Sequence, residues 1–281
     1  MKNQNPRNPG DSIPQTRKEA LMKLLVDEDE DVYSAIRETL LKLGRTNVSW
    51  MNAYALSDDP ILRTRVREII DDLSLREADE LFLVYCLNRR SSLDLERGLF
   101  LLAGTGFPNV CVEAYQAQFD EFVRPLSDLA GSVEERLAAL HQTFLGKLGF
   151  RAVFESVLST ELIYLNHVVD NRTGHSMVLS FLLILFARRL GIELELLSFD
   201  HGIHWCADGE SSKILFKFEG EGIVSGRESY DPKKVMKNRQ MLALNCSALL
   251  RACKGTDQET VRRVLYYRAA LADCLPGMSM F

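Results

Sequence analysis

The sequence predicts a predominantly helical α+β protein, in which helices precede a small antiparallel sheet. Apolar residues recur at helical spacing through most of residues 18–126, and residues 177–190 are apolar on every side apart from Ser180 and the terminal arginines. Two later segments, Glu193–Phe199 and Ser212–Gly220, alternate as strands do. With 281 residues, the chain is long enough for one sizeable core or several smaller ones.

We expect residues 1–17 to be a disordered tail, because prolines stand at positions 6, 9 and 14 and no apolar run resembles a secretory signal. A helical region over residues 18–130 follows. Its first predicted helix is Asp31–Gly44, with Asp31 as the cap. A second is Pro60–Leu73, with Asp59 as the cap.

The first two helices share a short motif. Ile36-Arg37-Glu38 matches Val66-Arg67-Glu68, which lies 30 residues further on. Paired units of this kind resemble those of HEAT-like helical-repeat proteins, although two copies also suit an ordinary helical bundle. Two more helices are predicted, one within Ser91–Pro108 and one at Val112–Val123.

A core region is expected over residues 131–235. It begins with an amphipathic helix that ends at Gly149, and a second helical stretch covers Glu161–Arg172. The apolar helix Met177–Leu190 is the predicted centre, and Gly191 ends it. The two predicted strands come after this helix.

The last part, residues 236–281, reads as two antiparallel helices separated at Gly255. Thr256 to Glu259 has the pattern of a capping box for the second helix. An exposed helical hairpin of this kind usually packs on the core or on a partner.

Composition narrows the classes of function. The net charge of -5 and the pI near 5.7 lack the excess of positive charge that is typical of proteins that bind nucleic acid or anionic membranes. The longest apolar run is too short to span a bilayer. Six cysteines are scattered without a paired motif, so we expect reduced thiols and a cytoplasmic protein; they are Cys86, Cys111, Cys206, Cys246, Cys253 and Cys274.

Ser176 is the first candidate for chemistry, since it stands at the predicted start of the apolar helix. Backbone N–H groups at such a start stabilise anions, but a serine hydroxyl also needs a base within reach. The plainer interpretation is that Ser176 or Thr173 caps the helix. The string GHSMV also approaches the G-x-S-x-G nucleophile elbow, but Val178 replaces its last glycine and the preceding residues look helical.

His201 and His204 follow the first predicted strand. If the segment is extended, His204 shares a face with Gly202 and Cys206, and His201 lies on the other face. Only one of the two can then face Ser176. A metal site at H-x-x-H-x-C is conceivable, but no further ligand cluster accompanies it, so we expect no metal and no cofactor. A purely structural histidine is the simpler alternative.

Several segments together resemble a known family. They are IRETLLKLG, DLERGLFLLA, LGFRAVF and LNHVVDNRTGHSMVLSFLLILFARRLGI, followed by a C-terminal helical pair. In this order they resemble the transglutaminase-like superfamily, and within it the SirB-type proteins. The resemblance implies a papain-like α+β core, a helical N-terminal extension and a tetratricopeptide-like C-terminal end.

The resemblance also implies which residues to compare. Active transglutaminase-like enzymes use Cys, His and Asp, and the cysteine position corresponds to Ser176. SirB-type proteins usually have proline at this position. This chain differs from the SirB-type pattern as well, because it has Ser176-Met177-Val178-Leu179 there. The family histidine corresponds to His201 or His204. The aspartate has no clear counterpart, with Glu219 nearest and Asp231-Pro232 later.

We therefore expect a protein-interaction or regulatory module, a pseudoenzyme with an unidentified protein partner and neither nucleic acid nor membrane as a ligand. The alternative is an atypical amidase-like or peptidase-like hydrolase that uses Ser176 with His201 or His204. The sequence leaves catalytic activity and oligomeric state open, and it favours the interaction module because helical hairpins present grooves to partners.

Overall fold

The computed structural model describes residues 13–88, 92–154, 159–199, 202–208, 213–220, 222–226, 235–253 and 258–272. The chain divides into two compact units, Met1–Glu80 and Leu81–Phe281. The division falls within the long helix α4 (Pro60–Leu87). The predominantly helical α+β class is confirmed, because two small sheets accompany many helices.

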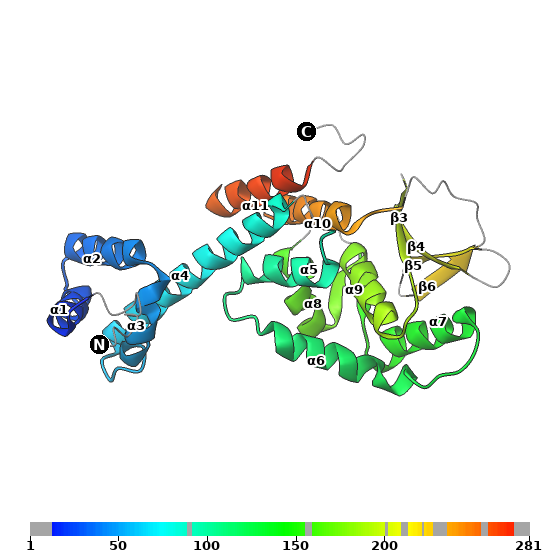
Figure 1. Cartoon of the computed structure of the whole chain (residues 1–281), viewed down its shortest axis with the longest axis horizontal. Helices are drawn as coiled ribbons and strands as arrows, with labels where there is room; N and C mark the ends of the chain where they lie inside the picture. Colours follow the sequence, from blue (N-terminus) through cyan, green and yellow to red (C-terminus); the bar gives the residue numbers. More distant parts are fainter. Residues whose placement is uncertain are drawn as a thin grey trace, which may run out of the picture. The chain divides into compact units, whose positions relative to one another are not determined.

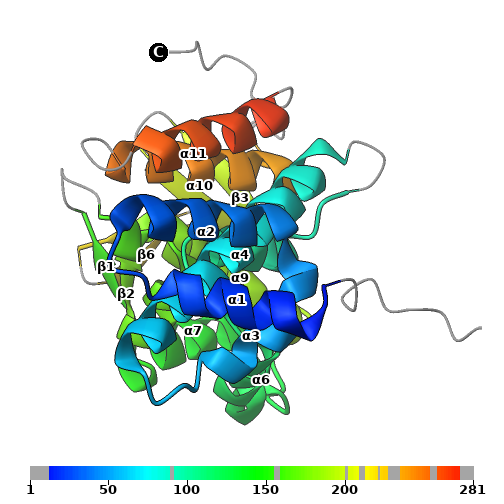
Figure 2. The same cartoon turned by 90° about the vertical axis from the view of Figure 1, so that its left-hand side faces the viewer.

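The first unit is entirely helical where it is described. It contains α1 (Gln15–Leu25), α2 (Glu30–Leu43), the 3₁₀ turn η2 (Arg45–Asn47), α3 (Val48–Tyr54) and the first part of α4. Helices α1 and α2 lie side by side (Figure 2). Their buried faces share one core, formed by Leu21, Met22, Leu25, Leu40, Leu41, Met51, Val66, Ile69 and Leu73.

Helix boundaries in this unit differ from the prediction at three places. Asp29, not Asp31, caps α2, because its Oδ1 accepts a hydrogen bond from Asp31 N at 2.9 Å. Several acidic residues in a row offer equivalent caps in sequence, and only the backbone chooses between them. Helix α1 includes residues 15–17 of the predicted tail, while residues 1–12 lie outside the described part. Helix α4 continues to Leu87, since no glycine or proline interrupts it after Leu73.

Two cap predictions are confirmed. Asp59 Oδ1 accepts from Ile61 N at 2.8 Å, and Gly44 ends α2 with φ of 73°, which favours glycine. The matched arginines, however, make different contacts: Arg37 pairs with the Asp72 carboxylate, and Arg67 Nε donates to Ala55 O at 3.0 Å. The helical-repeat interpretation therefore stays a prediction.

The second unit contains the largest core. Its helices are α5 (Leu95–Gly104), α6 (Val112–Val123), α7 (Val133–Gln142), α8 (Leu165–Asn171), α9 (Ser176–Arg189), α10 (Asn238–Ala252) and α11 (Gln258–Leu271). Shorter turns are η3 (Arg124–Leu126), the π-type η4 (Thr143–Lys147) and η5 (Thr160–Leu162). Helix α9 lies among α5, α6, α8 and α10 (Figure 1), and it is buried from Met177 to Ala187. The predicted central helix is confirmed.

Aromatic side chains join α9 to its neighbours. The Phe186 ring of α9 lies 5.3 Å from that of Phe119 in α6 and 5.8 Å from that of Phe144 in η4. Phe144 in turn lies 6.3 Å from Phe218, which comes from the sheet. The inner face of the sheet is therefore the one that packs towards α9.

The main sheet is antiparallel in the order β3 (Glu195–Phe199), β4 (Gly202–Asp208), β5 (Lys213–Glu219) and β6 (Gly222–Gly226). Leu196 pairs with Trp205, and Trp205 pairs with Phe216. A second, parallel pair joins β1 (Arg151–Val153) to β2 (Thr173–His175). Three-residue strands such as these carry too little periodicity to be predicted from sequence.

Helices α10 and α11 form the predicted C-terminal hairpin (Figure 1). The predicted break at Gly255 and the capping residue Thr256 lie outside the described residues. The hairpin shares the large core with α5 and α9, and so does α6. The sequence-based division near residue 130 thus differs from the structure, which groups α5 and α6 with the core. Among the described helices, none has both the length and the apolar character needed to cross a bilayer.

Candidate functional site

The start of α9 is built by an abrupt change of chain direction. Helix α8 ends at Asn171, and Arg172 adopts a left-handed conformation with φ of 56° that leads into β2. The Arg172 guanidinium lies over the rings of Phe122, at 4.3 Å, and Phe150, at 5.0 Å. These cation–π contacts hold the turn in place and so position the residues that follow it.

Strand β2 places Gly174 and His175 directly before the helix. A Cβ at Gly174 would lie 2.6 Å from Cγ1 of Val168, so only glycine fits this close approach. The predicted helical stretch Glu161–Arg172 is present as α8, and the three-residue strand β2 lies between it and Ser176. Ser176 thus follows a strand-to-helix turn, although Val178 still occupies the position of the elbow's last glycine.

His175, not Ser176 or Thr173, caps α9. Its Nδ1 accepts a hydrogen bond from Met177 N at 3.3 Å, and Thr173 Oγ1 donates instead to Asn171 O at 3.2 Å. An N-cap needs extended backbone, and pairing with Val153 keeps His175 extended. The prediction that Ser176 or Thr173 caps the helix is therefore wrong.

Ser176 is half-buried as the first residue of α9. Its carbonyl accepts a hydrogen bond from Ser180 Oγ at 2.8 Å, whereas its own Oγ forms no hydrogen bond with a described residue. Burial, together with the nearby Arg251 cation, lowers the pKa of His175. His175 is then neutral at neutral pH, and because its Nδ1 accepts from Met177 N, its proton is on Nε2.

His204 lies on the outer face of the main sheet. It is opposite Leu197 in the register, and Leu197 belongs to the small outer cluster with Cys206 and Leu215. Its neighbour Trp205 is fully buried on the inner face, in the core that contains α9. Since successive side chains alternate between faces, the sheet separates the His204 ring from the α9 side.

The structure therefore does not bring His204 and Ser176 together. His201 lies outside the described residues. The predicted alternation is as expected for His204 and Cys206, which share the outer face.

The other candidates lie apart from Ser176. Glu219 is exposed at the end of β5, where its Oε1 is 3.2 Å from Lys217 Nζ. Cys206 is buried, with its Sγ 3.5 Å from Glu195 Oε2. Asp231 and Pro232 lie outside the described residues. Within the described ranges, no group of three or more His, Cys, Asp or Glu side chains is placed to hold a metal ion.

The sequence did not predict that His175 caps the helix that begins at Ser176, or that Arg251 lies near His175. His175 could have been noticed, since it directly precedes Ser176 and its ring is a possible cap. Nothing in the sequence relates Arg251, from α10, to this site. Only the packing of α10 beside α9 brings Arg251 near His175.

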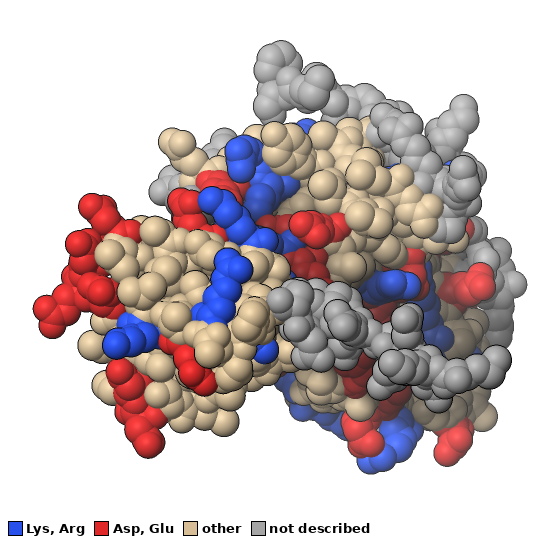
Figure 3. Space-filling view, turned by 60° about the vertical axis from the view of Figure 1, so that its left-hand side comes forward, with Lys and Arg blue, Asp and Glu red and all other residues tan. Residues whose placement is uncertain are grey.

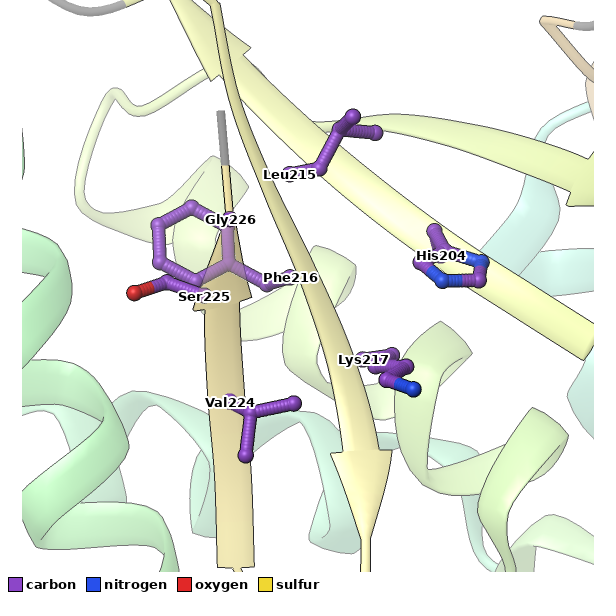
Figure 4. Close-up of a pocket in the computed structure, with 7 residues that line it drawn as sticks. All are labelled: His204, Leu215, Phe216, Lys217, Val224, Ser225 and Gly226. Carbon is purple, nitrogen blue, oxygen red and sulfur yellow. The ribbon is translucent and has the colours of Figure 1, made fainter. Parts of the chain in front are cut away.

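A small hollow lies on the outer face of the sheet, beside His204 (Figure 4). Its volume is about 170 Å³, and it is lined by His204, Leu215, Phe216, Lys217, Val224, Ser225 and Gly226. Figure 4 shows the side chains of Leu215, Lys217 and Val224 on the His204 side of the strands, and the Phe216 ring on the other side.

Comparison with known proteins gives one match. The family model of the transglutaminase-like superfamily matches residues 113–242, from α6 to the first turns of α10. No curated protein and no solved structure matches the chain. The matched segment includes both β2 and the start of α9, together with the whole main sheet.

Proposed function

Starting from the transglutaminase-like domain at residues 113–242, we propose that this protein is a SirB-type interaction or regulatory module without standard cysteine chemistry. In this proposal the domain has a papain-like core in which Ser176 stands at the catalytic cysteine position and has no catalytic role. The protein would act in the cytoplasm through a protein partner. The observation that carries the proposal is the surroundings of Ser176.

A serine nucleophile needs a base about 2.6–3.2 Å from its hydroxyl, and that base is usually oriented by a third group. Ser176 Oγ has no hydrogen-bond partner among the described residues. His175 is adjacent in sequence, but its Nδ1 accepts from Met177 N and so is engaged in capping the helix. This arrangement suits a structural helix start better than a nucleophile and its base.

The inner face of the sheet supports the same proposal. There β4 presents Trp205, whose ring centroid lies 5.0 Å from that of Phe218. A fully buried indole in the hydrophobic core cannot accept a proton from a nucleophile. His204 is turned to the opposite face, where it lines the small hollow.

The surface of the protein is compatible with a protein partner. Figure 3 shows acidic and basic side chains interspersed on one face, which is the pattern of an ordinary protein surface rather than of a phosphate-binding one. In the first unit, Leu56 and Ile61 remain 78% and 54% exposed. Single exposed apolar side chains are common on protein surfaces, so these two are compatible with a partner without identifying a binding patch.

A serine-directed fluorophosphonate probe tests the proposal. We expect the wild-type protein to be labelled no more than the matched Ser176→Ala variant, with the labelled peptide identified by mass spectrometry. Labelling at Ser176 that is lost in the variant would overturn the proposal. It would favour the alternative hydrolase that uses Ser176 as its nucleophile.

A further inference from the structure

Strand β6 is the last strand of the main sheet, and no described residue pairs with its outer edge. An edge strand presents backbone N–H and C=O groups to any extended chain that approaches. Proteins usually protect such edges with lysine, proline or a bulge. Strand β6 reads Gly-Ile-Val-Ser-Gly, and its register with β5 runs from Leu215↔Gly226 to Glu219↔Gly222 without a bulge.

The strand is held firmly on one side and exposed on the other. Ile223 packs against the large core, which anchors β6 to the domain. Val224 remains 36% exposed, and Ser225 and Gly226 are exposed as well. An ordered strand with an accessible edge does not need to be rearranged before it binds another strand.

The hollow beside His204 adjoins this edge, because β6 contributes three of its lining residues: Val224, Ser225 and Gly226. At about 170 Å³ it is smaller than the pockets that hold cofactors or drug-sized ligands, and it has room for about one side chain. Among its polar lining residues, Lys217 and His204 have their side chains on the same side of the strands (Figure 4).

The charge of the hollow favours an acidic side chain. Lys217 Nζ lies 3.2 Å from Glu219 Oε1, and the two side chains are 38% and 61% exposed. An exposed pair of this kind is weak, so the Lys217 ammonium can turn to another carboxylate. Glu219 itself does not line the hollow.

We propose that the outer edge of β6 binds an extended peptide segment of a partner protein, which adds to the sheet as a further strand and places a carboxylate side chain in the hollow at Lys217. The proposal names a surface and a class of partner for the interaction module, and it rests on that proposed function. Main-chain hydrogen bonds to β6 supply the affinity, and the hollow supplies the preference for an acidic residue.

A second copy of the chain is a poorer occupant of this edge. A five-residue strand is only about 17 Å long. Stable protein interfaces bury about 1,200–2,000 Å², which is more than an edge of this length can supply. A peptide that binds weakly and reversibly matches the size of the site.

The test uses the full chain and three synthetic peptides with blocked ends. The first is Thr-Val-Glu-Val-Thr, the second has lysine in place of glutamate, and the third has proline in place of both valines. Amide chemical shifts are followed by NMR during titration. We expect the first peptide to shift the amides of Gly222–Gly226 and Lys217, and Lys217→Gln to weaken its binding about fivefold. Val224→Glu, which places a like charge beside the peptide carboxylate, should weaken it further, whereas the matched Val224→Thr should retain binding.

Three results would overturn the proposal: no shifts in β6 at millimolar peptide, equal binding of the lysine or proline peptide, or β6 shifts that follow protein concentration alone and so report a second copy. The proposed function is tested by a different experiment. Labelling of Ser176 by the fluorophosphonate probe would overturn the proposed function, whether or not the peptide binds. If Ser176 is not labelled and the peptide does not bind, only the proposal of a binding surface at β6 is overturned.

Discussion

Replacing His141 by phenylalanine is expected to reduce the acid sensitivity of the second unit. The His141 ring lies edge-on to Phe216, with ring centroids 5.0 Å apart, and to Trp205, at 6.0 Å. Its Nε2 is completely buried and has no hydrogen-bond partner among the described residues. This burial lowers the pKa of His141 from its ordinary value of 6.5 to about 4.

The sign of the effect follows from proton uptake. Below pH 6.5 the unfolded chain binds a proton at His141, and the folded protein does not bind one until the pH falls to about 4. The unfolded state therefore binds more protons in this window, and stability falls as the pH falls. Between about pH 7.5 and pH 5, His141 alone lowers the free energy of unfolding by about 2 kcal/mol.

Urea unfolding at the two pH values measures this loss. The chain has two tryptophans, so a Trp50→Phe background leaves Trp205 as the fluorescent reporter of the second unit. We expect the loss of stability between the two pH values to be about 2 kcal/mol smaller in His141→Phe than in the parent. His141→Gln, which also lacks a titrating ring, should behave in the same way. If the parent and both variants lose the same stability, burial does not control the protonation of His141.

Two further predictions concern the packing around α9. Gly174→Ala should lower the free energy of unfolding by about 1–3 kcal/mol, because the new Cβ would lie 2.6 Å from the stiff Val168 side chain. Adding Val168→Ala should relieve this clash and restore stability. Equal melting temperatures for the wild type and Gly174→Ala would contradict the prediction. Arg189→Met should lower the free energy of unfolding, measured in urea, by about 3 kcal/mol. Arg189 forms an ion pair with Glu96 at 2.7 Å, and the Glu96 side chain is only 13% exposed, so the substitution leaves a buried carboxylate without its cation. The double variant Arg189→Met/Glu96→Gln should recover part of this loss, and additive losses would show that the pair is not coupled.

Much of the helical structure could be predicted because apolar periodicity acts locally. Helix α6 runs from Val112 to Val123 as predicted, and α9 differs from the predicted Met177–Leu190 by one residue at each end. Errors arose where neighbouring residues offered equal alternatives. Asp29 and Asp31 are equivalent as caps in sequence, and at α9 the extended backbone required of a cap falls on His175.

The candidate site was less predictable, because its residues meet only through long-range packing. Arg251 reaches the surroundings of His175 from α10, and β1 pairs with β2 across the intervening helix α8. The transglutaminase-like domain was expected from the order of its segments, and the match at residues 113–242 supports that expectation.

By itself, the sequence determined the mostly helical class, the buried helix α9 and the serine at its start, since these depend on local composition and spacing. Strand alternation also required that His204 and Trp205 lie on opposite faces. Which face is turned to α9 was decided only by the tertiary structure. Burying the large Trp205 ring with Phe216 and Phe218 against the helical core removes the most apolar surface from water, and this leaves His204 on the outer face.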